Sequence, residues 1–133
     1  MPLTPETLRL AHGELTGQII DSFYTVYNVL GDGFVESVYI RALQVELELR
    51  GISSEREAPL TVLYRGRVVG DFRVDLLVVA TIVVEVKTAD RIAKPHQKQL
   101  SNYLRASDRS VGLLLNAGDR PTVKRVIHTG RSN

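Results

Sequence analysis

The spacing of apolar residues separates a helical N-terminal third from a middle third with the alternation of strands. Between Glu14 and Leu30, apolar residues recur every three or four positions, which predicts a helix with one buried stripe. Gly31-Asp32-Gly33 interrupts this pattern, and a second helical stretch follows from about Val35 to Arg50. Gly51 stands where a glycine commonly ends a helix. The first third therefore predicts two consecutive helices.

The middle of the chain is dense in β-branched residues and has no helical period. Leu60–Tyr64 and Arg67–Val69 predict two strands joined by a tight turn at Arg65-Gly66. Asp71–Val79 predicts a longer strand, and Ile82–Lys87 predicts the next one. This region is therefore expected to form the antiparallel part of a sheet.

The last third returns to helix and ends in two strands. Lys94–Ala106 predicts a helix, Ser110–Leu115 a strand, Asn116–Pro121 a loop and Thr122–His128 a final strand. The order α-α-β-β-β-α-β-β predicts an α/β fold, with a mixed sheet flanked by helices. The helix after the third strand would cross over to a parallel neighbour. Without repeats or linkers, residues 1–133 are expected to form one domain with a core from about 14 to 128.

Composition narrows the class of protein. A hydrophobic share of 44% and a charged share of 24% are ordinary for a globular domain. The absence of cysteine excludes disulfides and cysteine-based zinc or iron–sulfur sites, and it fits a cytoplasmic protein. The longest apolar run, Leu76–Val84, is far shorter than the roughly 20 residues that span a bilayer. The N-terminus also lacks the basic and apolar regions of a secretory signal, so neither a membrane partner nor export is expected.

The net charge of +2 is unevenly distributed. Residues 1–60 hold 4 Lys/Arg against 9 Asp/Glu, and residues 61–133 hold 13 against 6. A basic C-terminal half suggests a face that attracts phosphate. On charge alone, solvated helix faces and a basic tail are the more ordinary explanation.

Two carboxylates on neighbouring predicted strands are the strongest chemical signal. Glu85 and Lys87 share a strand face, and Asp75 lies on the preceding strand among apolar residues. Adjacent antiparallel strands would place the two carboxylates about 5 Å apart, where Mg²⁺ would compensate their repulsion. The alternative is a pair of ordinary ion bridges, Asp75 with Arg73 and Glu85 with Lys87, which spacing does not exclude.

The residue sequence of these segments also resembles the motifs of a known family. Asp75, followed after nine residues by Glu85-Val86-Lys87, resembles the D…(D/E)xK signature of the PD-(D/E)XK nuclease superfamily, with Val74 in place of the proline. Residues 33–39, GFVESVY, read G-x-x-E-x-x-Y and resemble the GxxExxY protein family, a small-domain branch of that superfamily. The similarity extends from about residue 14 to 127. Two positions depart from the family pattern: Tyr27 stands where a histidine is usual, and residues 116–118 read Asn-Ala-Gly rather than Asn-Phe-Gly.

The resemblance implies a role for each residue of the signature. Glu36 would be a helix-borne carboxylate that faces the sheet and contributes to the metal site. Asp75 and Glu85 would bind Mg²⁺ or Mn²⁺ directly, and the carbonyl of Val86 would add a further ligand. Lys87 would orient or activate the attacking water and stabilise charge on the phosphate.

Further candidates lie on the helix after the third strand. Gln99 and Tyr103 are an i, i+4 pair similar to the QxxxY element of some superfamily exonucleases, although a solvated Gln beside a core Tyr explains the spacing equally well. Basic residues on and near this helix could contact phosphate, although a solvated helix face is the simpler explanation for them. The candidate nucleic-acid contacts are Arg73, Lys94, Lys98 and Arg105.

The sequence therefore predicts a metal-dependent nuclease that hydrolyses phosphodiester bonds, with DNA as the expected substrate. The alternative is a catalytically inactive nucleic-acid-binding or protein-interaction module that keeps the nuclease fold. The complete set of signature residues favours the enzyme, and the small size favours action as a homodimer or with a partner protein.

Overall fold

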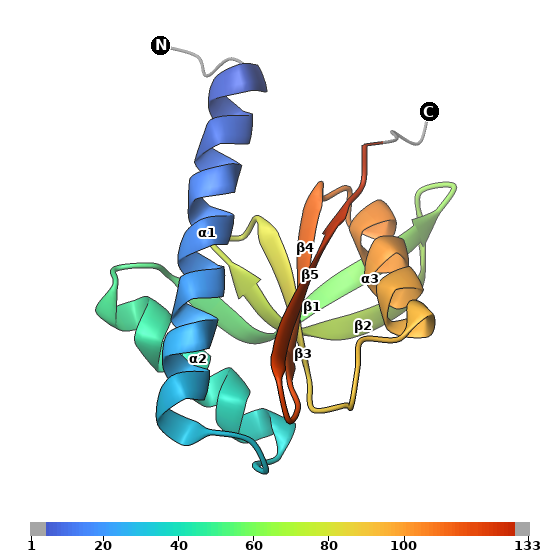
Figure 1. The fold of residues 1–133 in the computed structure, drawn as a ribbon. Coiled ribbons are helices and arrows are strands. Elements are labelled where there is room, and N and C mark those ends of the chain that lie inside the picture. Colours follow the sequence, from blue (N-terminus) through green and yellow to red (C-terminus); the bar gives the residue numbers. More distant parts are fainter. Residues whose placement is uncertain (1–4, 130–133) are drawn as a thin grey trace.

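A five-stranded sheet carries two helices on one face and one helix on the other (Figure 1). The computed structural model describes residues 5–129, with side chains from residue 13 onward. The elements are α1 (Pro5–Leu30), α2 (Glu36–Leu49), β1 (Ser54–Tyr64), β2 (Arg67–Val78), β3 (Ile82–Lys87), α3 (Lys94–Ala106), β4 (Val111–Ala117) and β5 (Pro121–Ile127). This order confirms the predicted fold class. Within the described part of the chain, no helix combines the length and hydropathy needed to cross a lipid bilayer.

The sheet has the order β1-β2-β3-β4-β5 and is mixed. Only β3 and β4 run parallel, and α3 connects them, so the predicted crossover is confirmed. β1 begins at Ser54, earlier than predicted, because its first residues pair with the end of β2, Ser54 with Val78. The segments predicted as 67–69 and 71–79 are one continuous strand for the same reason. β4 extends to Ala117, because that residue still pairs with Pro121 of β5.

Each face of the sheet buries its own apolar cluster. The cluster under α1 and α2 is the larger, and its biggest side chains are Phe23, Tyr39 and Leu43. The second cluster lies under α3, where Leu100 and Leu104 pack on Leu114 of β4. Because both faces are covered, β3 and β4 are buried along almost their whole length. A charged side chain on these two strands is therefore placed between the sheet and a helix.

The β1–β2 hairpin turns through two residues, as predicted. Arg65 and Gly66 have φ of 51° and 77°. Two consecutive positive φ values give the turn whose twist matches that of the flanking strands, and glycine accepts this backbone without strain.

Candidate active site

Asp75 and Glu85 face each other where β2 and β3 separate. The β2–β3 ladder ends at the pair Leu76 and Val84. At the next pair of residues, Asp75 and Glu85, hydrogen bonds from side chains to backbone amides take the place of the backbone-to-backbone hydrogen bonds. The amide of Val86 donates to Oδ2 of Asp75 at 2.7 Å, and the amide of Asp75 donates to Oε2 of Glu85 at 3.2 Å. Each carboxylate is thus held by the backbone of the opposite strand, which fixes the pair at one point.

The β1–β2 ladder is interrupted opposite Asp75, at Glu57 of β1. The β1–β2 register passes from Arg56–Leu76 to Ala58–Val74 and skips Glu57 and Asp75. Glu57 has a positive φ of 53°, the mark of a local break in the ladder. Val74 packs in the α3 cluster, whereas Leu76 packs in the α1–α2 cluster. Asp75 therefore lies where the strand turns from one core to the other.

Burial and charge repulsion perturb the ionisation of Glu85, whose residue surface is only 7% exposed. Burial, with the hydrogen bond and negative charge of Asp75, raises the pKa of Glu85 from 4.5 to about 8, while its bond to the Asp75 amide and the charge of Lys87 oppose the shift. In the metal-free protein, binding of a proton by the Asp75–Glu85 pair is therefore favoured over ionisation of both carboxyls. A cation bound between the two carboxylates would displace that proton.

The alternative of two simple ion bridges is not what the structure contains. Among the residues described, the ion pairs are those of Arg50 with Asp21 and with Glu46. Arg73 is turned away from Asp75 and donates to the carbonyl of Glu57 at 3.0 Å. The carboxylate pair consequently lacks a bridging protein cation.

Residues 33–39 connect the loop between α1 and α2 to the first turns of α2. The Tyr39 hydroxyl donates to the carbonyl of Gly31 at 2.6 Å and accepts from the amide of Phe34 at 3.2 Å. This bracing fixes the start of α2. Oε2 of Glu36 accepts a hydrogen bond from the amide of Thr88 at 3.2 Å, directly after β3. The motif thus joins α2 to the end of the strand that carries Glu85.

The structure brings together two of the three predicted carboxylates. Asp75 and Glu85 are in contact, whereas Glu36 is exposed at Thr88, one residue beyond Lys87. Among the side chains described, residues 13–129, no three Asp, Glu, His or Cys converge closely enough to hold a metal. The Asp75–Glu85 pair offers hard oxygen donors without a bridging protein cation, which fits Mg²⁺ or Mn²⁺ with water completing the coordination.

Tyr103 lies in the electrostatic field of the pair, and Gln99 is exposed to solvent. The ring of Tyr103 stacks on Phe72 with centroids 4.0 Å apart and planes inclined by 15°. Burial raises the pKa of Tyr103, and the charges of Glu85 and Asp75 raise it further, which places its hydroxyl in their field. Gln99, one turn earlier, is exposed. Phe72 was not singled out by sequence, since a strand aromatic carries no signal of its own.

Asn116 is a site residue that sequence reasoning missed. It is fully buried at the end of β4, next to Lys87 in the register. Its Nδ2 donates to the carbonyl of Ala89, and its Oδ1 accepts from the amide of Ala89, both at 2.9 Å. The available signal was an amide residue directly after the apolar run 113–115, where a buried polar group needs partners.

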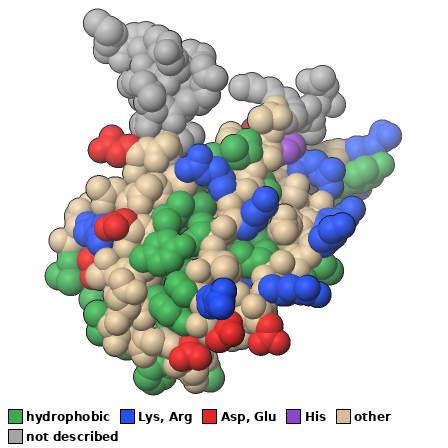
Figure 2. Space-filling view, in the orientation of Figure 1, with side chains coloured by type: hydrophobic (Ala, Val, Ile, Leu, Met, Phe, Trp, Pro, Cys, Tyr) green, Lys and Arg blue, Asp and Glu red, His purple; other side chains and the backbone are tan. Residues whose placement is uncertain are grey.

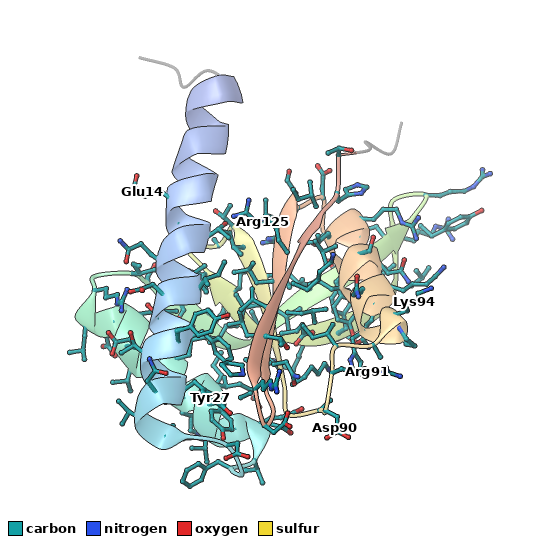
Figure 3. All side chains as sticks on the ribbon, in the orientation of Figure 1. Glu14, Tyr27, Asp90, Arg91, Lys94 and Arg125 are labelled. Atoms are coloured by element: carbon teal, nitrogen blue, oxygen red, sulfur yellow. The ribbon has the colours of Figure 1, made fainter. Side chains whose placement is uncertain are left out.

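The β3–α3 loop is also packed closely against Gly118, through the carbonyl group of Ala89. A Cβ at Gly118 would lie 2.3 Å from the carbonyl oxygen of Ala89. The hydroxyl of Tyr27, labelled in Figure 3, donates to the Gly118 carbonyl at 2.6 Å. Tyr27, one of the departures from the family pattern, thus tethers the β4–β5 loop.

Gly118→Ala is expected to destabilise the fold by about 1–3 kcal/mol, the range for overpacking a filled site. The added methyl must displace the backbone of Ala89. Gly17→Ala is the matched control, because Gly17 is exposed in α1 and has open space around its Cβ position. That control should stabilise by up to about 1 kcal/mol through helix propensity. Urea denaturation of both variants measures the difference, and equal stabilities would contradict the close approach.

Opposite charges surround the two sides of the site. Blue side chains gather in Figure 2 on the side where Figure 1 shows α3 and the β1–β2 hairpin, and red ones gather at the lower edge. All four predicted nucleic-acid contacts are exposed: Arg73, Lys94, Lys98 and Arg105. At the acidic side, an open pocket of about 340 Å³ is lined in part by Asp32, Asp90 and Asp119. The exposed cations therefore give the α3 side a positive potential.

Comparison with known proteins agrees with this geometry. A solved structure described as the crystal structure of SSO0001 superposes with a TM-score of 0.53 at 21% identity, over 70% of this chain and 50% of that one. The chain thus spans about half the length of that neighbour, and the likeness concerns the fold alone. No curated protein matches the chain. The family model of the PD-(D/E)XK nuclease superfamily matches residues 13–126. On that match, the chain belongs to the PD-(D/E)XK nuclease superfamily.

Proposed function

We propose that this chain is a Mg²⁺- or Mn²⁺-dependent nuclease of the GxxExxY branch that hydrolyses phosphodiester bonds in DNA. The observation that carries the proposal is the Asp75–Glu85 pair, which is fixed by reciprocal hydrogen bonds and lacks a bridging protein cation. Lys87 follows on the same strand. The absence of cysteine supports a cytoplasmic protein, and action as a homodimer or with a partner protein is part of the proposal.

Asp75 and Glu85 would hold the cation, with the Val86 carbonyl as a further ligand. A bound divalent cation would polarise the phosphate and lower the pKa of a coordinated water. Glu36 is anchored one residue beyond Lys87. A rotation of its side chain away from the Thr88 amide would direct the carboxylate toward the pair.

The remaining residues would act on the substrate. Lys87 would orient the attacking water and stabilise the negative charge that develops on the phosphate. Tyr103, held against Phe72, would border the scissile phosphate with its hydroxyl. Gln99 is exposed on the same helix, where it would reach a bound strand rather than the cation.

One observation favours the alternative of an inactive module that keeps the fold. Glu36 is engaged by the Thr88 amide, and the carboxylates of the described residues do not form a three-membered cluster. An inactive module would bind nucleic acid or protein without requiring a metal.

An end-labelled cleavage assay tests the proposal. Linear, nicked and branched DNA, with single-stranded RNA for comparison, is incubated with Mg²⁺, Mn²⁺, Ca²⁺ or a chelator. We expect cleavage of DNA with Mg²⁺ or Mn²⁺ and none with the chelator. Binding without cleavage under every metal condition would establish the inactive module instead.

A further inference from the structure

The β1–β2 hairpin ends in a short arm, residues 63–69, that extends beyond the body of the sheet (Figure 1). In the ladder Val62 pairs with Gly70, but Leu63 pairs with Val68. Val69 is therefore an extra residue in β2, which is a β-bulge. A bulge bends the strand and increases its twist, so the arm has a direction of its own.

The arm carries four large apolar side chains that are mostly exposed to solvent. Leu63, Tyr64, Val68 and Val69 are 58%, 61%, 66% and 61% exposed. Single exposed apolar residues are ordinary on any surface, but adjacent ones indicate an interaction. Four large apolar side chains on seven residues indicate that this segment contacts a partner.

The charges of the arm indicate the chemistry of that partner. Residues 61–70 contain Arg65 and Arg67 and neither Asp nor Glu. The guanidinium of Arg65 lies 5.6 Å from the centroid of the Tyr64 ring, and its Nε donates to the Tyr64 hydroxyl at 3.3 Å. Cations beside apolar wedges suit a nucleic-acid groove, where the arginines reach phosphate and the apolar side chains reach sugar and base edges.

A second copy of the chain fits this surface less well. Contact between two arms would bring together two pairs of arginines. Pairing along the free edge of β1 is also obstructed, because Pro59 has no amide hydrogen and the ladder breaks at Glu57. An anionic duplex meets neither obstacle.

The arm lies on the same side of the molecule as the catalytic candidates. Leu60 of β1 and Val74 of β2 pack in the α3 cluster, and Lys94 of α3, labelled in Figure 3, is exposed. Arg67 precedes Asp75 by eight residues along β2, which corresponds to at most about 25 Å, because the bulge at Val69 shortens the strand. That span is about seven base pairs of duplex.

We propose that the arm binds duplex DNA in a groove about seven base pairs from the scissile phosphate, so that the substrate is a duplex of at least that length. This inference rests on the proposed nuclease function and specifies its substrate. The α3 surface between the arm and the carboxylates would follow the intervening phosphates.

Fluorescence anisotropy tests the arm, with Ca²⁺ in place of Mg²⁺ and labelled duplexes of about 6 to 24 base pairs. The double variant R65S/R67S should bind the longest duplex about tenfold more weakly, and its salt slope should fall by about two. On the shortest duplex it should match the wild type. The control R41S/R125S removes the same charge: Arg41 is exposed on α2, and Arg125, labelled in Figure 3, is exposed on β5. It should bind as the wild type does.

A second variant isolates the apolar contribution. V68T/V69T keeps shape and charge, and it should lower affinity for the long duplex without changing the salt slope. Four results would overturn the inference. One is R65S/R67S binding like its control while the wild type cleaves DNA, which leaves the proposed function intact. A second is a wild type that neither binds nor cleaves any nucleic acid, which removes both. The third is loss of a dimer in V68T/V69T by sedimentation velocity, and the fourth is tighter binding to phosphatidylserine vesicles than to duplex.

Discussion

Lys87→Ala is expected to lower DNA cleavage by about a hundredfold or more while DNA binding changes little. Lys87 follows Glu85 by two residues on the same strand face, and its ammonium opposes the raised pKa of that carboxyl. A cation in this position stabilises mainly the charge that develops in the transition state. Removing it therefore lowers the rate of cleavage more than it lowers the affinity for DNA. Single-turnover cleavage and anisotropy on the same DNA separate the two quantities.

The control for this variant is Lys124→Ala, which removes an exposed lysine from β5. Its turnover should equal that of the wild type. Metal affinity of Lys87→Ala should persist or rise, because a competing positive charge is gone. A folded Lys87→Ala protein with normal cleavage would contradict the catalytic role. A fall in melting temperature would instead identify Lys87 as a stabilising partner of Glu85.

Asp75→Asn is expected to abolish cleavage and to weaken Mn²⁺ binding by at least about a hundredfold. Altering groups outside the ligand shell already costs about 10–100-fold in metal affinity, and this change removes a charged ligand. The amide oxygen can still accept the bond from the Val86 amide. Asp71→Asn, an exposed change on the same strand, should bind metal as the wild type does in calorimetry.

The metal-free stability of Asp75→Asn should equal or exceed that of the wild type. The folded-state pKa of Glu85 lies above its ordinary value, at about 8. The stabilisation that its proton provides is therefore complete below about pH 4.5 and is lost as the pH rises through 8. Removing the charge of Asp75 reduces this loss, so the difference in melting temperature should widen from pH 6 to pH 9. A metal-free variant that melts well below the wild type at every pH would show that Asp75 is structural.

The sequence alone determined the bounds of those helices and strands whose local residue pattern is uninterrupted. Ile82–Lys87 and Lys94–Ala106 have their predicted bounds, because one is an uninterrupted β-branched run and the other starts at Lys94-Pro95. The turn at Arg65-Gly66 was equally local. The sequence allowed Asp75 and Glu85 to be placed on one face of adjacent antiparallel strands, and the reciprocal hydrogen bonds decided that they meet.

Contacts between distant segments decided the rest. Glu36 bonds to an amide 52 residues away, and Asn116 bonds to Ala89, 27 residues before it. No local pattern encodes such partners, because they depend on which loops the sheet brings together at its end. The early start of β1 at Ser54 arose in the same way, from pairing with β2. The sequence thus determined which side chains are candidates for the chemistry. The tertiary structure decided which of them meet, because a hydrogen bond needs the geometry of both partners and only the folded sheet provides it.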